Sequence, residues 1–272
     1  MNMTVLRRNN VTVSGVGQRA LVFVHGFGCD QHMWRLVAPA FEDRYRVVLL
    51  DLVGAGQSDL TAYDPARYAT LAAHAEDVRA VLRELDLHGV VFVGHSVSAM
   101  IGVLAAIQEP ARFAQLVLVA PSPRFLNEDG YVGGFELADI EELLEAMSAN
   151  YLGWSGALAP VTTGHPTRPE LAAELTASFC RPDPSIARHF ARVTFLGDNR
   201  ADLCRVGTPT LLVQSARDAL APLAVGAYLH EQLAGSQLVV LNTSGHCPHL
   251  SAPHATIAAI DQFLSPTPLP EP

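Results

Sequence analysis

The chain contains no lysine, and all 18 of its basic residues are arginine. Schiff-base catalysis needs a lysine amine, and a Walker-type phosphate loop needs a lysine beside its glycines, so both chemistries are excluded. The 27 acidic residues leave a net charge of −9, which favours solubility and argues against a nucleic acid as partner.

Long apolar runs and cysteine motifs are also scarce. No run approaches the roughly 20 apolar residues that cross a bilayer, and the first twenty residues lack the apolar core of a signal peptide. The four cysteines, Cys29, Cys180, Cys204 and Cys247, show no metal-ligand spacing and are expected to be reduced. We therefore expect a soluble cytoplasmic protein that needs no membrane and no cofactor.

A serine motif is the most informative feature present. Residues 94–98 read Gly-His-Ser-Val-Ser and lie between the apolar run 90–93 and a helix-like segment. A serine on such a strand-to-helix turn projects its hydroxyl out of the sheet. Gly94 provides the small residue that the turn needs, whereas Ser98 stands where the usual pattern has glycine. We predict that Ser96 is a nucleophile rather than an ordinary helix-capping serine.

Two further motifs follow in the chain order Ser, Asp, His that is typical of alpha/beta hydrolases. Asp218 comes shortly after the expected strand 210–214, and His246 follows the expected strand 237–241. Because ligands gather beyond the carboxyl ends of parallel strands, we expect these side chains to meet Ser96. His246 would then remove the serine proton, and Asp218 would orient the imidazole.

Other residues compete for these roles. Asp202 is the rival acid, although it lies in a polar stretch rather than just after a strand, and Asp218 could be only a turn former. His249 and His254 are rivals of His246. The pair His246 and His249 superficially suggests a metal site, but two histidines alone are weak evidence for zinc, and we predict no metal.

The residues around the expected nucleophile predict an oxyanion hole and an apolar pocket. The strand 21–24 leads into His-Gly-Phe-Gly at 25–28, and we assign the oxyanion donors to the N–H groups of Phe27 and Val97. His25 and His95 are expected to pack and hydrogen-bond at the pocket floor. No arginine clamp is evident, which favours an apolar ligand, although aromatic residues at helical spacing are also typical of a core. The candidate substrate-binding residues are His95, Phe125, Phe135, Trp154, Phe190 and Phe195.

Alternating strand and helix patterns predict a mostly parallel sheet covered on both faces. Strand signals nearly vanish between two prolines, Pro121 and Pro209, so we expect a helical lid at 122–208, core regions at 1–121 and 209–264, and a disordered tail at 265–272. The expected strands are 11–13, 21–24, 46–52, 90–93, 116–119, 210–214 and 237–241, and the expected helices are 33–41, 70–87, 99–106, 136–150, 170–180, 185–195 and 252–264.

Several separated segments resemble one family. Residues 94–102 resemble the serine turn of plant karrikin and strigolactone receptor hydrolases, while 25–31, 51–59, 121–127 and 245–250 resemble both those receptors and the bacterial stress regulator RsbQ. The match extends through the lid at 133–136 and 150–154. Ser98 agrees with the plant pattern and departs from the bacterial one.

The resemblance implies an alpha/beta-hydrolase fold with an eight-stranded sheet and a four-helix lid inserted after the sixth strand, over a deep apolar pocket. It also implies slow hydrolysis of small apolar esters or butenolide-type lactones through an acyl-serine. In RsbQ-like proteins the hydrolase acts with a partner phosphatase in signalling.

Other functions remain open beside that one. The chain could be a receptor module for a partner protein with incidental hydrolysis, a metabolic carboxylesterase, or a hydrolase of C–C bonds or haloperoxidase-like relative. Dehalogenases and epoxide hydrolases are excluded because they carry an aspartate where Ser96 stands.

Overall fold

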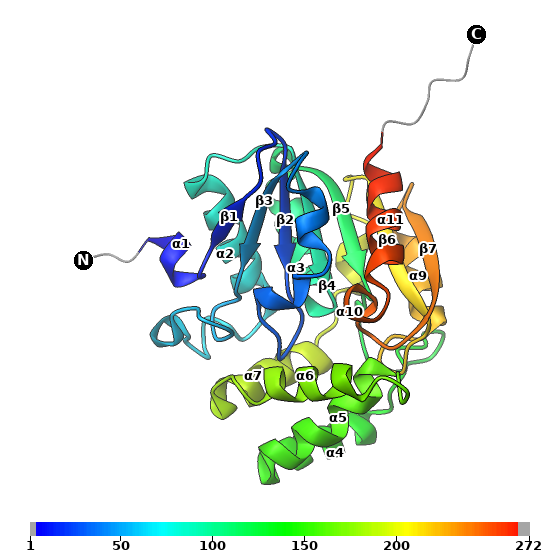
Figure 1. Ribbon diagram of the computed structural model, residues 1–272. Coiled ribbons are helices and arrows are strands. Elements are labelled where there is room, and N and C mark those ends of the chain that lie inside the picture. The colour runs from blue at the N-terminus through cyan, green and yellow to red at the C-terminus, as the bar shows by residue number, and fades with distance from the viewer. Residues whose placement is uncertain (1–3, 266–272) are drawn as a thin grey trace.

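The computed structural model describes residues 4–265 and shows one seven-stranded sheet flanked by helices (Figure 1). The strand order is β1-β3-β2-β4-β5-β6-β7, with β1 antiparallel to β3 and every other neighbouring pair parallel. This confirms the mostly parallel sheet. The strands are β1 (Thr12–Ser14), β2 (Ala20–Val24), β3 (Arg46–Leu50), β4 (Val90–His95), β5 (Phe113–Val119), β6 (Thr210–Arg217) and β7 (Gln237–Ser244).

The expectation of eight strands, with the lid after the sixth, is wrong for the described residues. The segment before β1 is a short helix, α1 (Val5–Arg8), whose first turn is capped by the Thr4 side chain, so it adds no further strand. The helical insertion consequently follows β5, the fifth strand, and leads into β6.

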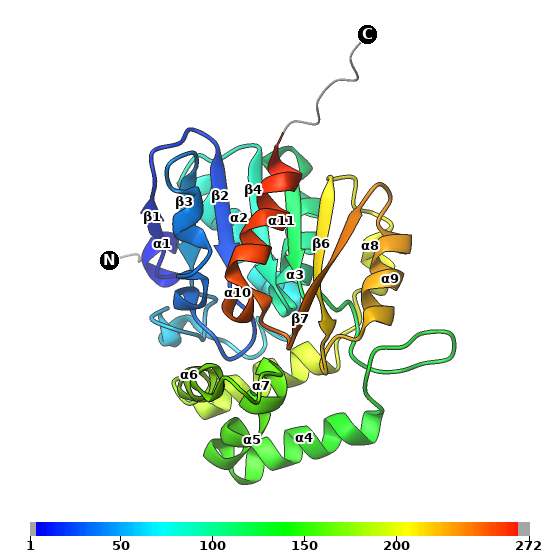
Figure 2. The same ribbon diagram turned by 45° about the vertical axis from the view of Figure 1, so that its right-hand side comes forward.

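Helices cover both faces of the sheet because alternate residues of each strand point to opposite sides. On one face, the sheet packs against the 3₁₀ turns η1 (Gln31–Trp34) and η2 (Ala38–Phe41) and against α11 (Pro253–Leu264). The other face packs against α2 (Leu71–Glu84), α3 (Val97–Gln108) and α9 (Leu223–Gln232). Figure 2 shows α11 in front of the sheet and α2 and α3 behind it. The remaining short elements are η3 (Leu60–Ala62), η4 (Pro110–Arg112), α8 (Arg200–Leu203) and α10 (Pro248–Ser251).

The expected helix at 33–41 is wrong, since this segment forms the two 3₁₀ turns instead. Pro39 falls at the start of the second turn and has no N–H to donate to a carbonyl four residues earlier. The chain therefore tightens into short turns that still bury Met33, Trp34 and Phe41.

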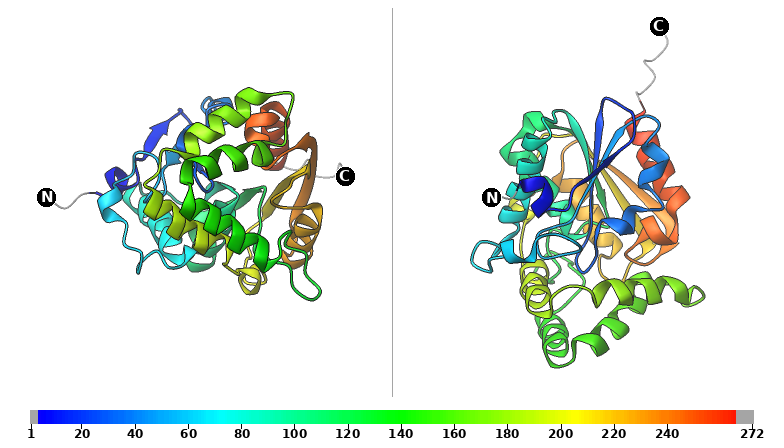
Figure 3. Two further views of the ribbon diagram at one scale, coloured as in Figure 1. Left: turned by 90° about the horizontal axis from the view of Figure 1, so that it is seen from below. Right: turned by 60° about the vertical axis from the view of Figure 1, so that its left-hand side comes forward.

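The segment between β5 and β6 contains four long helices, the number that the family resemblance implies for the lid, and the short helix α8. The long helices are α4 (Leu137–Ala149), α5 (Tyr151–Thr163), α6 (Pro169–Phe179) and α7 (Pro184–Phe195). They cross the end of the sheet, as the view from below shows (Figure 3). Helix α5 was not among the helices expected from residue patterns, because it contains Gly153, Gly156 and Pro160. We refer to residues 122–208 as the lid; the predicted domain boundaries stay a prediction.

Two further observations complete the fold. Among the described residues, no helix combines the length and the apolar character that crossing a bilayer requires. The predicted disordered tail at 265–272 lies, beyond Ser265, outside the described residues.

Candidate active site

Ser96 occupies a sharp turn between β4 and α3. Its φ of +54° and ψ of −121° lie in a region that non-glycine residues rarely adopt, which is the strained geometry of a nucleophilic serine at the end of a strand. The turn leaves no room at Gly94, where a Cβ would lie 2.4 Å from the carbonyl oxygen of Ser98. The glycine before the serine is therefore required by sterics.

Ser98 is accommodated by a specific hydrogen bond. Its side chain is fully buried, and its hydroxyl donates to the carbonyl oxygen of His25 at 2.5 Å. A buried hydroxyl without a partner would destabilise the turn, so this bond explains how serine replaces the usual glycine.

The three expected chemical groups form one line of hydrogen bonds. His246 Nε2 lies 2.8 Å from Ser96 Oγ, and His246 Nδ1 lies 2.7 Å from Asp218 Oδ2. Asp218 follows β6, His246 follows β7, and Ser96 follows β4, so parallel strands deliver all three to one edge of the sheet. The arrangement suits proton transfer from the serine to the imidazole.

The local environment holds Asp218 as a carboxylate. Burial raises the pKa of this carboxyl. The adjacent His246 and the N–H groups of Leu220 and Ala221 together lower it by more, so that the net pKa lies below the usual value of 3.8. An ionised Asp218 accepts from His246 Nδ1–H and leaves Nε2 free to accept the serine proton.

The rival residues lie elsewhere. Asp202 pairs with Arg205 at 2.9 Å, and His249 packs between Trp34 and His95. His254 belongs to helix α11. None of these three side chains has a hydrogen bond to Ser96 within residues 4–265.

Both backbone polar groups of His246 are held in place. Its N–H donates to the carbonyl oxygen of Thr162 in the lid at 2.7 Å, and its carbonyl accepts from His95 Nε2 at 2.8 Å. The structure thus gives His95 a positioning contact, which matches the floor role expected for it. The contribution of Thr162 comes from a main-chain carbonyl, which carries no signal in the sequence.

The predicted oxyanion segment lies against the nucleophile. A Cβ on Gly26 would be 3.3 Å from the Cβ of Ser96, so the chain leading to Phe27 passes directly beside the serine. Val97 is the first residue of α3, where an N–H has no partner within the helix. Within residues 4–265, neither the Phe27 nor the Val97 N–H donates a hydrogen bond, so both are available to an anionic oxygen.

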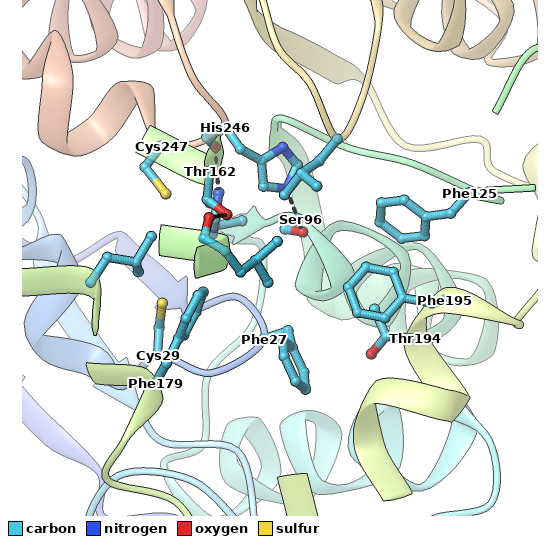
Figure 4. Close-up of a pocket in the computed structure, with 14 residues that line it drawn as sticks. Phe27, Cys29, Ser96, Phe125, Thr162, Phe179, Thr194, Phe195, His246 and Cys247 are labelled. Atoms are coloured by element: carbon cyan, nitrogen blue, oxygen red, sulfur yellow. Dashed lines mark hydrogen bonds between the residues drawn. The ribbon is translucent and has the colours of Figure 1, made fainter. Parts of the chain in front are cut away.

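Ser96 and His246 line a mostly apolar cavity (Figure 4). Of the six predicted substrate-binding residues, His95, Phe125 and Phe195 line it. Phe27, whose N–H is assigned to the oxyanion hole, also lines it. The wall residues that sequence reasoning did not name as substrate-binding are Cys29, Leu158, Thr162, Leu175, Phe179, Thr194, Leu220 and Cys247. Most of these belong to lid helices. Which face of such a helix meets the cavity depends on how the helix packs against the core, and the sequence pattern does not give this.

The other three predicted residues do not line this cavity. Trp154 stacks on Phe179, and Phe190 packs on Phe27, so both support the wall from behind. The main chain of Phe135 hydrogen-bonds to the carbonyl of Phe125 at 3.1 Å. Whether any of these side chains touches a substrate stays a prediction.

Two cysteines of the cavity wall lie deep in the protein. Burial raises the pKa of Cys29 to about 12 and holds the pKa of Cys247 well above its usual value, so both are thiols. Cys247 also lies near His95 and His249, with one ligand atom of each within 4.8 Å of the others. His95 already bonds the His246 carbonyl through Nε2, and the prediction of no metal site stays a prediction.

Comparisons with known proteins identify the family and the fold. The family model described as alpha/beta hydrolase fold matches residues 19–253. The chain is 40% identical to karrikin insensitive 2 receptor IA of Petunia hybrida, over 94% of this chain and 93% of the receptor. It is 41% identical to strigolactone esterase D14 of Arabidopsis thaliana, over 96% of both chains. Among solved structures, a hydrolase from Oleispira antarctica is 42% identical, with a TM-score of 0.93 over 95% of each chain.

Proposed function

Since this chain belongs to the alpha/beta hydrolase family, we propose that it hydrolyses small apolar esters or butenolide-type lactones through an acyl-serine at Ser96. The observation that carries the proposal is the chain of hydrogen bonds from Asp218 through His246 to Ser96, which ends in the wall of an apolar cavity. Strigolactone esterase D14, a named esterase similar over nearly its whole length, supports the same chemistry.

In the first half of the reaction, Ser96 Oγ attacks the carbonyl carbon while His246 Nε2 takes its proton. The carbonyl oxygen becomes negatively charged and accepts hydrogen bonds from the N–H groups of Phe27 and Val97. The intermediate collapses, the C–O bond to the alcohol breaks, and His246 returns the proton to the leaving oxygen. For a lactone, the leaving hydroxyl remains attached to the acyl chain.

In the second half, water attacks the acyl-serine and His246 accepts its proton. Collapse of the second intermediate releases the acid, and His246 returns the proton to Ser96 Oγ. Asp218 remains ionised throughout and stabilises the imidazolium in both halves.

The decisive experiment follows 4-nitrophenyl acetate hydrolysis by the wild type and by Ser96→Ala. We expect a burst of 4-nitrophenol that requires Ser96, followed by slow steady release, because a signalling hydrolase would deacylate slowly. Ser98→Gly is the matched control, since it changes a neighbouring serine to the residue that the usual pattern has. Equal rates in wild type and Ser96→Ala would refute the catalytic assignment.

We place this activity in signalling, in the manner of RsbQ, with a cytoplasmic location and a partner signalling protein such as a phosphatase. The similarity to a named karrikin insensitive receptor supports the signalling role and also favours a second candidate, a receptor module in which hydrolysis is incidental. Fast steady turnover without a burst would favour a metabolic carboxylesterase. Ligand-dependent capture of a partner by Ser96→Ala would favour the receptor.

A further inference from the structure

Thr194 carries a hydroxyl group that the protein does not use. Within residues 4–265, only two buried hydroxyls lack a hydrogen-bond partner, those of Thr194 and Ser215, and only Thr194 lines the cavity. Burying a hydroxyl without a partner costs free energy, so a retained one points to a partner that binds there.

The Thr194 hydroxyl does not bond to the carbonyl oxygen that its own helix could provide. Serine and threonine within helices commonly donate to the carbonyl four residues earlier. The side chains that do so here are Ser148, Ser155, Thr162, Thr176 and Thr256. Thr194, near the end of α7, makes no such bond to Phe190.

The position of Thr194 separates it from the reacting atoms. The next residue, Phe195, packs on Phe125 and Phe27, which fixes this end of α7 against the cavity. In Figure 4, Thr194 lies on the Phe195 side of the cavity, away from His246. A substrate whose carbonyl reaches Ser96 would extend its remaining atoms toward this wall.

Apart from the main-chain N–H groups assigned to the oxyanion hole, the other nitrogen and oxygen groups that line the cavity are engaged or covered. The hydroxyls of Ser96 and Thr162 bond to His246 and to the carbonyl of Leu158, and His95 Nε2 bonds to the His246 carbonyl. His95 Nδ1 has no partner, but a Cβ on Gly26 would come within 2.4 Å of it, so the main chain covers it. Thr194 is therefore the wall hydroxyl left for a ligand.

We propose that the Thr194 hydroxyl donates a hydrogen bond to a second oxygen of the substrate, an ether or carbonyl oxygen on its otherwise apolar body. This inference rests on the proposed function and narrows its substrate class. It selects esters and lactones with an acceptor oxygen apart from the scissile carbonyl over purely hydrocarbon ones.

The test compares 4-nitrophenyl esters in which one CH₂ group is exchanged for an oxygen of similar size. Three pairs move the oxygen along the acyl chain: butanoate with methoxyacetate, pentanoate with 3-methoxypropanoate, and hexanoate with 4-methoxybutanoate. We would measure kcat/KM for wild type and for Thr194→Val, which keeps the shape and removes the hydroxyl. Differences in intrinsic ester reactivity cancel, because both enzymes see the same pair.

We expect the preference for the ether ester to fall about three- to tenfold in Thr194→Val for at least one pair, the size of one lost neutral hydrogen bond. Thr176→Val is the matched control, since its hydroxyl bonds to the Ala172 carbonyl within its own helix and its side chain does not line the cavity, and it should leave the ether-to-alkyl ratio unchanged. Ratios within twofold of the wild type in all three pairs would overturn the inference.

Two readouts distinguish a role of Thr194 in binding substrate from a structural role and from failure of the proposed function. The ligand-free Thr194→Val protein should unfold at the same temperature as wild type or higher, and a clear drop would show that the hydroxyl already has a partner within the protein. If the alkyl esters are hydrolysed equally with and without Ser96, the proposed function fails. If they require Ser96 while the ratios do not change, only the role of Thr194 fails.

Discussion

The core and the lid hold their functional residues by different means. In the core, Ser96, Asp218 and His246 follow parallel strands whose register is set by main-chain hydrogen bonds. The lid helices have no such ladder with the sheet. They are held by aromatic packing around Phe27 and by polar links such as Tyr63 to His189. The proposed reacting groups thus follow strands that the backbone ladder aligns, whereas much of the cavity wall is formed by packed lid side chains.

The two regions meet at His246, the proposed catalytic base. The lid supplies the Thr162 carbonyl that accepts the His246 N–H, and the core supplies His95, which donates to the His246 carbonyl. Gly245 lies at this junction with a φ of +85°, and a Cβ there would come within 1.9 Å of the Thr163 carbonyl oxygen. The lid therefore contacts the backbone of His246 as well as forming part of the pocket wall.

The largest expected effect is a loss of kcat when Asp218, a residue of the core, is replaced. Asp218→Asn should lower kcat by about 10⁴-fold, because the amide stabilises the wrong imidazole tautomer. Asp202→Asn tests the rival acid and should retain kcat, since Asp202 bonds Arg205 rather than His246. Steady-state kinetics with 4-nitrophenyl acetate measure both. Equal losses in the two variants would contradict the assignment.

A smaller effect is expected at the junction. Gly245→Ala forces a side chain into a positive-φ site against the lid, so it should shift His246 and lower kcat roughly 10- to 100-fold with less change in KM. Gly156→Ala, in the lid helix α5 that Gly245 contacts, is the control: a Cβ there meets no atom within 4 Å, and stability should rise by about 0.5–1 kcal/mol. If Gly245→Ala retains full kcat, the lid does not position the histidine.

This contrast between core and lid also explains which parts of the fold and the site can be predicted from the sequence. The core strands were predicted because buried parallel strands appear as apolar runs, and the loops that follow them carry Ser96, Asp218 and His246. The predicted catalytic residues therefore come together without any lid information. The expectation of an eighth strand came only from the family resemblance. In the described residues the segment before β1 is the helix α1 instead of a strand.

The lid was predicted less well for physical reasons. Helix α5 was missed because Gly153, Gly156 and Pro160 lower its helix propensity, and packing on the core stabilises it all the same. Helical spacing identifies aromatic residues but not which face meets the cavity. Phe195 lines the wall while Phe190, on the same helix, packs behind Phe27. Thr194 gives no signal in the sequence, since its importance comes from a missing partner.

A third prediction concerns the stability of the core at acid pH. The folded pKa of Asp218 lies below 3.8, so its carboxylate stabilises the fold above pH 3.8, and this contribution is lost as pH falls through the folded pKa. Urea unfolding of wild type and Asp218→Asn should therefore differ most near neutrality and converge in strong acid. A difference that stays constant from pH 6 to about pH 2.5 would show that the ionised carboxylate does not stabilise the fold.

The smallest expected effect is in the polar links of the lid. Arg35 and Glu174 pair at 2.6 Å between the core and α6, with side chains about a third exposed. Glu174→Gln should lower the free energy of unfolding by less than about 1 kcal/mol, because water and salt screen a pair at this depth. The loss should shrink further in 1 M salt, which urea unfolding at low and high salt would measure. A loss of several kcal/mol would mean that charge pairing holds the lid in place, and the comparison between a backbone-held core and a packing-held lid would need to be redrawn.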